Sequence, residues 1–335
     1  MDTIEPAPIR TDLLDRDDVS EPLQVVPPVV AVVITSDPGP SLDAALGALA
    51  AQDYPSLSVL VLDNGSRTDP TPQIAKAMPR AFVRRRPAGD EDRVGFAAAA
   101  NDALDAVEGA VFLLFCHDDV VPDPDAVRLL VEEAYRSNAG IVGPKFVDDA
   151  HPDLLVEVGM AVDHYGVPYS AIEPGEVDQE QHDAVRDVFF VSHEAMLVRT
   201  DLFHELGGFD PATFPGADDV DLCWRARLAG ARVVVAPAAR VRLRVDEATE
   251  AARRADSARV RAETAARVRV LLKSYSSLAL IWILPTGFLL SVGEAVGSML
   301  SGHVRRGFAM IGGWFVPLAH AGELGRARRA VQRSR

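Results

Sequence analysis

The stretch VVAVVITSDPGPSLDAALGALAAQDYPSLSVLVLDNGSRTD, residues 29–69, decides the fold. Two apolar, β-branched runs flank a segment whose apolar residues have helical spacing. A continuous apolar run is typical of a strand that is covered on both faces, as in a parallel sheet. Thr35 and Asp37 follow the first run, and Asp63 ends the second. Because ligands bind at the carboxyl ends of strands in such sheets, these three side chains are candidate binding residues.

The alternation of strands and helices continues to about residue 240. Further strands are expected at 82–84, 111–115, 141–143, 188–191, 195–199 and 233–235, and further helices at 95–107, 125–135 and 218–229. Residues 147–187 are less regular and rich in Pro and acids, which is typical of a loop region or a variable insertion. The pattern predicts an α/β fold with a mostly parallel central sheet and helices on both faces.

The 335 residues divide into three predicted parts: an acidic, disordered leader at 1–27, an α/β domain at 28–245 and a helical region at 246–335. The leader lacks the apolar core of a signal peptide, so we expect the α/β domain to stay in the cytoplasm. Only two cysteines are present, which excludes a disulfide framework, and no Cys/His cluster indicates structural zinc.

The helical region at the end of the chain has the composition of a membrane-contacting segment. Residues 246–272 are rich in Ala and Arg, and residues 274–293 contain no charged side chain. This uncharged segment is long enough to span a bilayer as a helix. Pro285 and Gly287 interrupt this run, so a re-entrant or interfacial helix is equally consistent with it. The alternative is an ordinary buried helical hairpin.

Charge is distributed unevenly along the chain. Residues 25–239 hold 35 acidic and 15 basic residues, whereas residues 240–335 hold 17 basic and seven acidic ones. An acidic body is a poor nucleic-acid binder, because contacts to phosphate need Lys and Arg. A basic end beside apolar segments suits an anionic membrane surface. We therefore expect a membrane partner and no nucleic acid.

Four sequence motifs, of which the stretch 29–69 is the first, follow one another along the chain. They are the stretch 29–69, then GFAAAANDAL and VFLLFCHDDVVPDPDAV (95–104 and 111–127), then AMLVRTDLFHELGGFDPATF (195–214), then GADDVDLCWRARLAGARVVVAPAARV (216–241). Over residues 29–244 the chain resembles the family 2 inverting glycosyltransferases with the GT-A fold. It looks most like their bacterial cell-wall branch of rhamnosyl- and galactofuranosyltransferases. The resemblance implies a Rossmann-like GT-A domain, a nucleotide-sugar donor and a divalent cation.

The resemblance places a nucleotide site at the strand ends. Asp63 would accept a hydrogen bond from a uracil or thymine imide or from a ribose hydroxyl, and Thr35, Asp37 and Asp118 would face the same pocket. Arg93 would reach the diphosphate. Each has a plainer alternative: an Asx-turn for Asp63, a helix cap for Asp37 and a solvated loop position for Arg93.

The resemblance places a metal motif at His117-Asp118-Asp119, where the family carries Asp-x-Asp. Asp119 and His117 are the predicted ligands of Mn²⁺ or Mg²⁺, and an imidazole suits Mn²⁺ better than Mg²⁺. A second departure is that residues 241–244 lack the histidine that the family often has there. Either the metal binds differently, or Arg242 or Arg244 replaces part of its charge, or metal binding is lost.

The resemblance also identifies a catalytic pair and an acceptor side. Asp219 matches the base that deprotonates the acceptor hydroxyl, with Asp218 beside it; helix N-capping is the plainer alternative. His193 and Glu194 stand where the family has small residues and would reshape the sugar pocket, and His193 could join His117 at an unusual metal site. The predicted acceptor groove also includes two residues of the same helix, Asp221 and Trp224, of which Trp224 is as consistent with a core position.

We therefore expect an inverting glycosyltransferase at the cytoplasmic face of a bacterial membrane. It would move a sugar from a UDP- or dTDP-linked donor to a hydroxyl of a lipid-linked or polysaccharide acceptor. One alternative, motivated by the substitutions at His117 and His193, is a non-catalytic GT-A module that binds nucleotide-sugar or glycan or scaffolds a membrane assembly. Another is a soluble sugar-nucleotide enzyme with a buried C-terminal hairpin.

Overall fold

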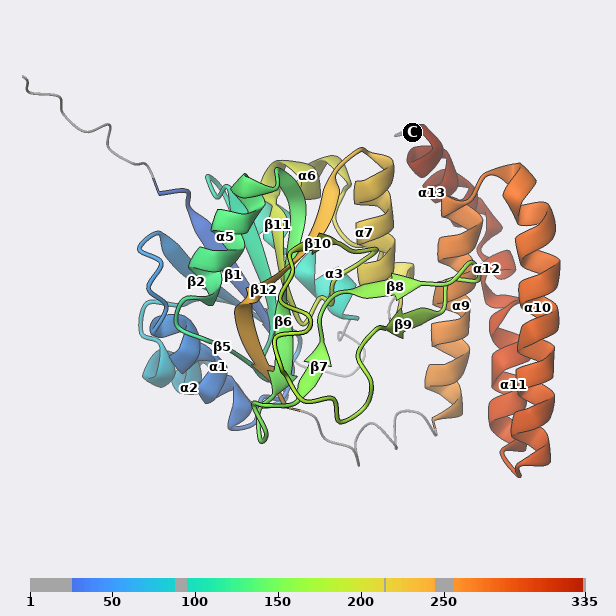
Figure 1. Cartoon of the computed structure of the whole chain (residues 1–335), viewed down its shortest axis with the longest axis horizontal. Helices are drawn as coiled ribbons and strands as arrows, with labels where there is room; N and C mark the ends of the chain where they lie inside the picture. The colour runs from blue at the N-terminus through green and yellow to red at the C-terminus, as the bar shows by residue number, and fades with distance from the viewer. Residues whose placement is uncertain (1–25, 88–94, 214, 245–255, 334–335) are drawn as a thin grey trace, which may run out of the picture.

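The computed structural model describes residues 26–87, 95–213, 215–244 and 256–333. The predicted leader lies outside these residues except for Val26 and Pro27, and Arg93 lies outside them as well. A central sheet with helices on both faces forms one part of the molecule, and a group of helices from the end of the chain stands beside it (Figure 1). The main path of the sheet runs β10-β12-β6-β11-β4-β1-β2-β3.

The parallel half of the sheet contains the strands that the sequence predicted most clearly. They are β1 (Val29–Thr35), β2 (Leu57–Asp63), β3 (Phe82–Arg85) and β4 (Phe112–His117), all mutually parallel. In this register Thr35 pairs with Asp63, and Ile34 pairs with His117. Three predicted site residues therefore come to the same carboxyl edge of the sheet.

The other half of the sheet is mixed, so the sheet as a whole is less parallel than predicted. Strand β11 (Ala195–Arg199) runs antiparallel between β4 and β6 (Ala139–Asp148), and β12 (Arg232–Leu243) runs parallel to β6. The short strands β5 (Val120–Pro122), β7 (Leu155–Glu157) and β10 (Arg186–Asp187) are antiparallel additions. Apolar patterning reports burial and not strand direction, which is why the sequence did not predict this reversal.

Two apolar cores lie on opposite faces of the sheet, which confirms the predicted layering. Helices α1 (Ser41–Ala50), α2 (Thr71–Ala77) and α5 (Ala126–Arg136) cover one face. Helices α3 (Phe96–Ala100), α4 (Ala103–Ala106), α6 (Thr200–Glu205) and α7 (Asp218–Leu228) belong to the other.

Two predicted elements differ in detail. The helix expected at 95–107 is split into α3 and α4, and Asn101 at the break exchanges two hydrogen bonds with the backbone of Phe209, at 2.9 and 2.8 Å. The strand expected at 188–191 is reduced to an isolated bridge between Met160 and Phe190.

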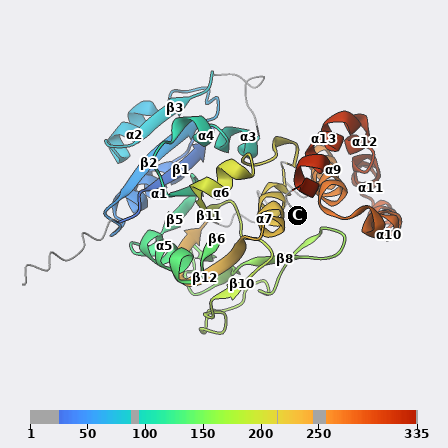
Figure 2. The ribbon, with the colours of Figure 1, turned by 90° about the horizontal axis from the view of Figure 1, so that it is seen from above.

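Residues 256–333, the described part of the chain end, form helices beside the sheet (Figures 1 and 2). They are α9 (Ser257–Ser274), α10 (Ser277–Leu300), α11 (Val304–Gly313), α12 (Val316–Ala319) and α13 (Ala321–Arg333). Helix α9 lies nearest the sheet, and α10 is long and apolar enough to cross a membrane. Only 17% of the apolar window of α10 is buried, so α10 is not the core helix of a buried hairpin.

Helix α9 is joined to the sheet domain by a buried network of charges. Lys273, 1% exposed, forms ion pairs with Asp210 and, at 2.6 Å, with Asp221. Arg269 contacts Asp210 at 3.0 Å, and Arg225 contacts Asp221 at 2.8 Å. Burial alone would raise the pKa of Asp210, but Lys273 and Arg269 outweigh burial and hold that pKa at about 2.

Candidate functional site

The predicted nucleotide side of the site includes Asp118, in the turn after β4. The hydroxyl of Thr35, at the end of β1, donates a hydrogen bond to the Asp118 carboxylate. Burial raises the pKa of Asp118, the bond from Thr35 opposes that rise, and the neighbouring Asp119 adds to it. Thr35 and Asp118 therefore lie together, as the sequence predicts, at the edge where β1 and β4 end.

Asp63 and Asp37 both accept hydrogen bonds from the loop that follows β2. Asp63 is 1% exposed; its Oδ1 accepts from the backbone N–H of Ser66 at 3.0 Å and from the Ser66 hydroxyl, and its Oδ2 accepts from Arg85 at 2.8 Å. Asp37 accepts from the backbone N–H of Arg67 at 2.8 Å and does not cap α1. The bond from the Ser66 N–H comes from three residues on and not two, so it is not the Asx-turn that was the alternative for Asp63. A carboxylate with these partners keeps lone pairs for a further donor.

Three rings join the end of β4 to the start of β11. The ring centroid of Phe96 lies 4.8 Å from that of His117 and 4.3 Å from that of His193, and the two histidines are 5.0 Å apart. The sequence did not predict a role for Phe96; its only signal was its place in the GFAAAANDAL motif. This ring cluster brings the predicted metal motif next to the predicted sugar pocket.

His193 in turn lies between the two predicted catalytic carboxylates. Its Nδ1 is 3.5 Å from an oxygen of Asp218 and 3.5 Å from an oxygen of Asp219. These separations exceed a normal N–H···O hydrogen bond but suit neighbouring ligands around one ion. Asp218 is fully buried, and within the described part of the chain neither of its oxygens has a hydrogen-bond partner. These three residues form a group that can hold a metal ion.

The group that can hold a metal ion is therefore made of residues other than the two ligands predicted from the sequence. Asp119 and His117 lie at the end of β4, whereas the described group is made by His193, Asp218 and Asp219. His193 was also expected to join His117 at a metal site. Their rings are in contact, but His117 is not one of the three residues of this group.

Charges around this cluster shift the pKa values of its members. Burial lowers the pKa of His193, but Asp218, Asp219 and Glu194 outweigh burial and raise it to about 10. Burial raises the pKa of Asp218, against the opposing effect of His193. Glu157, on β7, is a buried acid that the sequence did not single out, because it lies in the irregular stretch; burial, Glu194 and Asp219 raise its pKa to about 8.

The predicted catalytic pair lies at the start of helix α7. Ala217 is the N-cap residue and makes no side-chain cap, while one oxygen of Asp219 accepts from the Val220 backbone N–H at 2.7 Å. The predicted alternative of N-capping therefore does not describe Asp218 or Asp219. Carboxylates in a first helical turn are stabilised by the helix dipole.

Asp221 and Trp224 are not part of the site, contrary to their predicted place in the acceptor groove. Asp221 is buried in the charge network with Arg225 and Lys273. Trp224 packs edge-on against Phe189 and Tyr275, so it takes the core position that was its alternative.

The remaining predicted residues have mixed outcomes. Glu194 is half-buried, and its backbone carbonyl accepts from the His117 N–H at 3.0 Å, which places it beside the cluster. Arg242 forms ion pairs with Asp149 at 3.3 Å and with Asp123 at 3.8 Å, so its charge is already matched.

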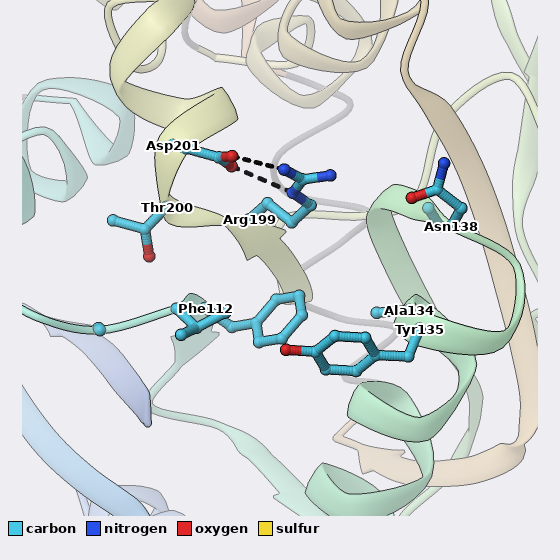
Figure 3. A pocket seen from close by; sticks show the side chains of 10 residues that line it. Phe112, Ala134, Tyr135, Asn138, Arg199, Thr200 and Asp201 are labelled. Atoms are coloured by element: carbon cyan, nitrogen blue, oxygen red, sulfur yellow. Dashed lines mark hydrogen bonds and ion pairs between the residues drawn. The ribbon is translucent and has the colours of Figure 1, made fainter. Parts of the chain in front are cut away.

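A separate cavity of about 410 Å³ lies at the opposite edge of the sheet, beside Phe112 at the start of β4 (Figure 3). Tyr135 packs edge-on against Phe112, and Arg199 forms an ion pair with Asp201, two residues on, at one wall of the cavity. None of the predicted site residues lines it.

Comparison with known proteins gives concordant results. The family described as "Glycosyltransferase like family 2" matches residues 27–265. The N-acetylglucosaminyl-diphospho-decaprenol L-rhamnosyltransferase of Mycobacterium tuberculosis is 33% identical over 235 residues, which cover 64% of this chain and 74% of that protein.

Two solved structures share the fold. The mannosyltransferase PcManGT from Pyrobaculum calidifontis, in complex with GDP-Man and Mn²⁺, has a TM-score of 0.52 and 20% identity, covering 92% of this chain and 87% of its own. GalNAc-T7, with UDP, GalNAc and Mn²⁺, has a TM-score of 0.60 and 14% identity over 75% of this chain; this chain spans about half, 48%, of its length. The fold is thus the predicted GT-A fold, and the chain belongs to glycosyltransferase family 2.

Proposed function

We propose that this protein is an inverting glycosyltransferase that moves a sugar from a UDP- or dTDP-linked donor to a hydroxyl of a lipid-linked cell-envelope glycan. The observation that carries the proposal is the meeting of two half-sites. The Thr35–Asp118 bond belongs to the proposed donor side, and the contact between the tilted rings of His117 and His193 connects it to Asp218 and Asp219 on the proposed acceptor side.

On the acceptor side, Asp219 is the proposed base. One of its oxygens is held by the Val220 N–H, which fixes the carboxylate, and the other faces His193. In a single displacement the acceptor oxygen attacks the anomeric carbon, its proton passes to Asp219, and the nucleoside diphosphate leaves. Attack from the face opposite the leaving group inverts the anomeric centre.

A divalent cation fits the residues present. His193, Asp218 and Asp219 offer one nitrogen and two oxygens, a set that would suit Mn²⁺, and the unpartnered oxygens of buried Asp218 support it. Because the Val220 N–H holds one oxygen of Asp219, the oxygen that faces His193 would have to be free of the cation when Asp219 accepts the acceptor proton. Asp119 and His117 remain the ligands proposed from the sequence. When bound, the cation supplies positive charge near the diphosphate of the donor.

The acceptor and location are proposed from two observations. The mycobacterial relative is named for a diphospho-decaprenol acceptor, and the present chain carries the exposed apolar helix α10. Together they support a lipid-linked acceptor at the cytoplasmic face of the membrane.

The test is sugar transfer by the purified chain to N-acetylglucosaminyl-diphospho-polyprenol in vesicles, with UDP- and dTDP-sugars in turn. Asp219→Asn is expected to lower turnover at least about 100-fold, because it removes the base. Asp105→Asn, an exposed acid on α4, is the matched control and should retain full activity. Unchanged turnover in Asp219→Asn, or a product that retains the donor configuration, would overturn the proposal.

A further inference from the structure

A second cavity lies between the catalytic domain and the C-terminal helices. It has a volume of about 310 Å³ and is formed by the β8–β9 hairpin (Met160–Val162 and Pro168–Ser170), the loop before α7, and helices α9 and α11. Figure 1 shows this hairpin reaching from the sheet domain to α9. No residue of the site described above lines it.

Two arginines of this cavity are not neutralised. Arg267, on α9, has one side-chain hydrogen bond, to the Ser291 hydroxyl at 3.4 Å, and Arg306, on α11, has a buried Nε without a hydrogen-bond partner. Neither forms an ion pair within the described residues. Burial lowers the pKa of Arg267, although Glu294 and Asp163 are near enough to oppose this effect.

The one acid that lines the cavity is already paired. Glu263 accepts a hydrogen bond from Arg259 at 2.7 Å, one turn earlier on α9. By contrast, Arg269 and Lys273, farther along the same helix, both have carboxylate partners. Within the described residues, Arg267 and Arg306 therefore lack a direct carboxylate partner at a partly desolvated place, where pairing with an anion is stronger than in water.

The cavity also lies between the catalytic helix and an exposed apolar surface. Gly216, in its lining, is two residues before Asp218, and a Cβ at Gly216 would lie 3.1 Å from the side chain of Glu263. Helix α11, which supplies Arg306 and Met310 to the lining, also exposes Phe308 (64%). An anion held here would therefore lie next to the segment that leads into Asp218 and against a helix that exposes an aromatic side chain.

We propose that this arginine pocket, defined by Arg267 and Arg306, binds the diphosphate that links an acceptor sugar to its lipid. The proposal rests on the proposed function and names how that acceptor is held. A guanidinium binds phosphate oxygens through two parallel N–H bonds, so two arginines suit a diphosphate. The lipid chain would follow the apolar surface of α10 and α11, and the sugar would extend toward Asp219.

Vesicle binding tests the pocket without catalysis. Phosphatidylcholine vesicles that contain geranylgeranyl diphosphate are mixed with the full chain and sedimented, beside vesicles that contain geranylgeraniol. We expect tighter binding to the diphosphate vesicles, and a loss of about tenfold in that affinity for Arg267→Gln and for Arg306→Gln. Arg305→Gln removes the same charge from the neighbouring, exposed position of α11 and should bind as the unmodified protein does.

Two further arms separate the sources of phosphate. Inorganic diphosphate should compete with the geranylgeranyl diphosphate vesicles, whereas vesicles of phosphatidylcholine with phosphatidylglycerol should show no dependence on Arg267 or Arg306. Equal losses for Arg305→Gln, or equal dependence with phosphatidylglycerol, would mean a general basic surface and would overturn the pocket. Asp219→Asn should bind the diphosphate vesicles normally, so failure of the catalytic proposal remains distinguishable.

Discussion

Replacing Lys273 by methionine should loosen the connection between α9 and the catalytic helix α7. Lys273 is 1% exposed and contacts carboxylates of both Asp210 and Asp221. Methionine fills similar volume without charge, so the change leaves the buried Asp221 and the half-buried Asp210 with one cation fewer. Breaking a buried ion pair by removing one partner costs about 3–5 kcal/mol.

The lower end of that range applies here, because each acid retains an arginine. Arg269 stays 3.0 Å from Asp210, and Arg225 stays 2.8 Å from Asp221. A loss of about 3 kcal/mol corresponds to a fall in Tm of roughly 4 °C for a protein of this size.

The assay is thermal unfolding followed by circular dichroism, with limited proteolysis to detect release of the C-terminal helices. Arg261→Met is the matched control, because Arg261 is an exposed cation on the same helix. If Lys273→Met and Arg261→Met unfold within about 1 °C of each other, the charge network does not hold α9 in place and the reasoning is wrong.

Three further outcomes are expected. In Mn²⁺ titrations followed by electron paramagnetic resonance, His193→Ala should weaken binding at least about tenfold more than His117→Ala; equal effects would reject the group around His193. Because the pKa of folded Asp210 is about 2, against about 3.9 in an unfolded chain, its stabilisation is present above about pH 4 and is lost as pH falls toward 2. Acid unfolding of Asp210→Asn should therefore be shallower over this interval than that of the unmodified protein, and identical slopes would contradict it. Trp282→Glu should reduce sedimentation with phosphatidylglycerol vesicles several-fold, whereas Tyr135→Glu, an exposed aromatic residue on α5, should leave it unchanged.

The sequence was most informative where function follows from strand ends. A parallel strand places its last residue at a shared edge, so Thr35, Asp63 and His117 were correctly expected to meet there. The contact between His193 and His117 depends on β11 running antiparallel to β4, which apolar patterning does not encode. The order of strands along the chain therefore predicted the candidate donor side. It did not show that Asp218 and Asp219 lie next to His193.

Helix α7 was predicted, but the different surroundings of its three acids could not be predicted from its own residues. Its acids Asp218, Asp219 and Asp221 occupy one turn, and a local pattern gives no reason to separate them. The separation comes from distant partners, because His193 faces the first two and Lys273 takes the third. One turn of helix thus belongs both to the candidate catalytic site and to the buried connection with α9. A change in the position of α9 would act directly on the helix that carries the proposed base, so the C-terminal region contributes to the arrangement of the site as well as to its proposed membrane contact.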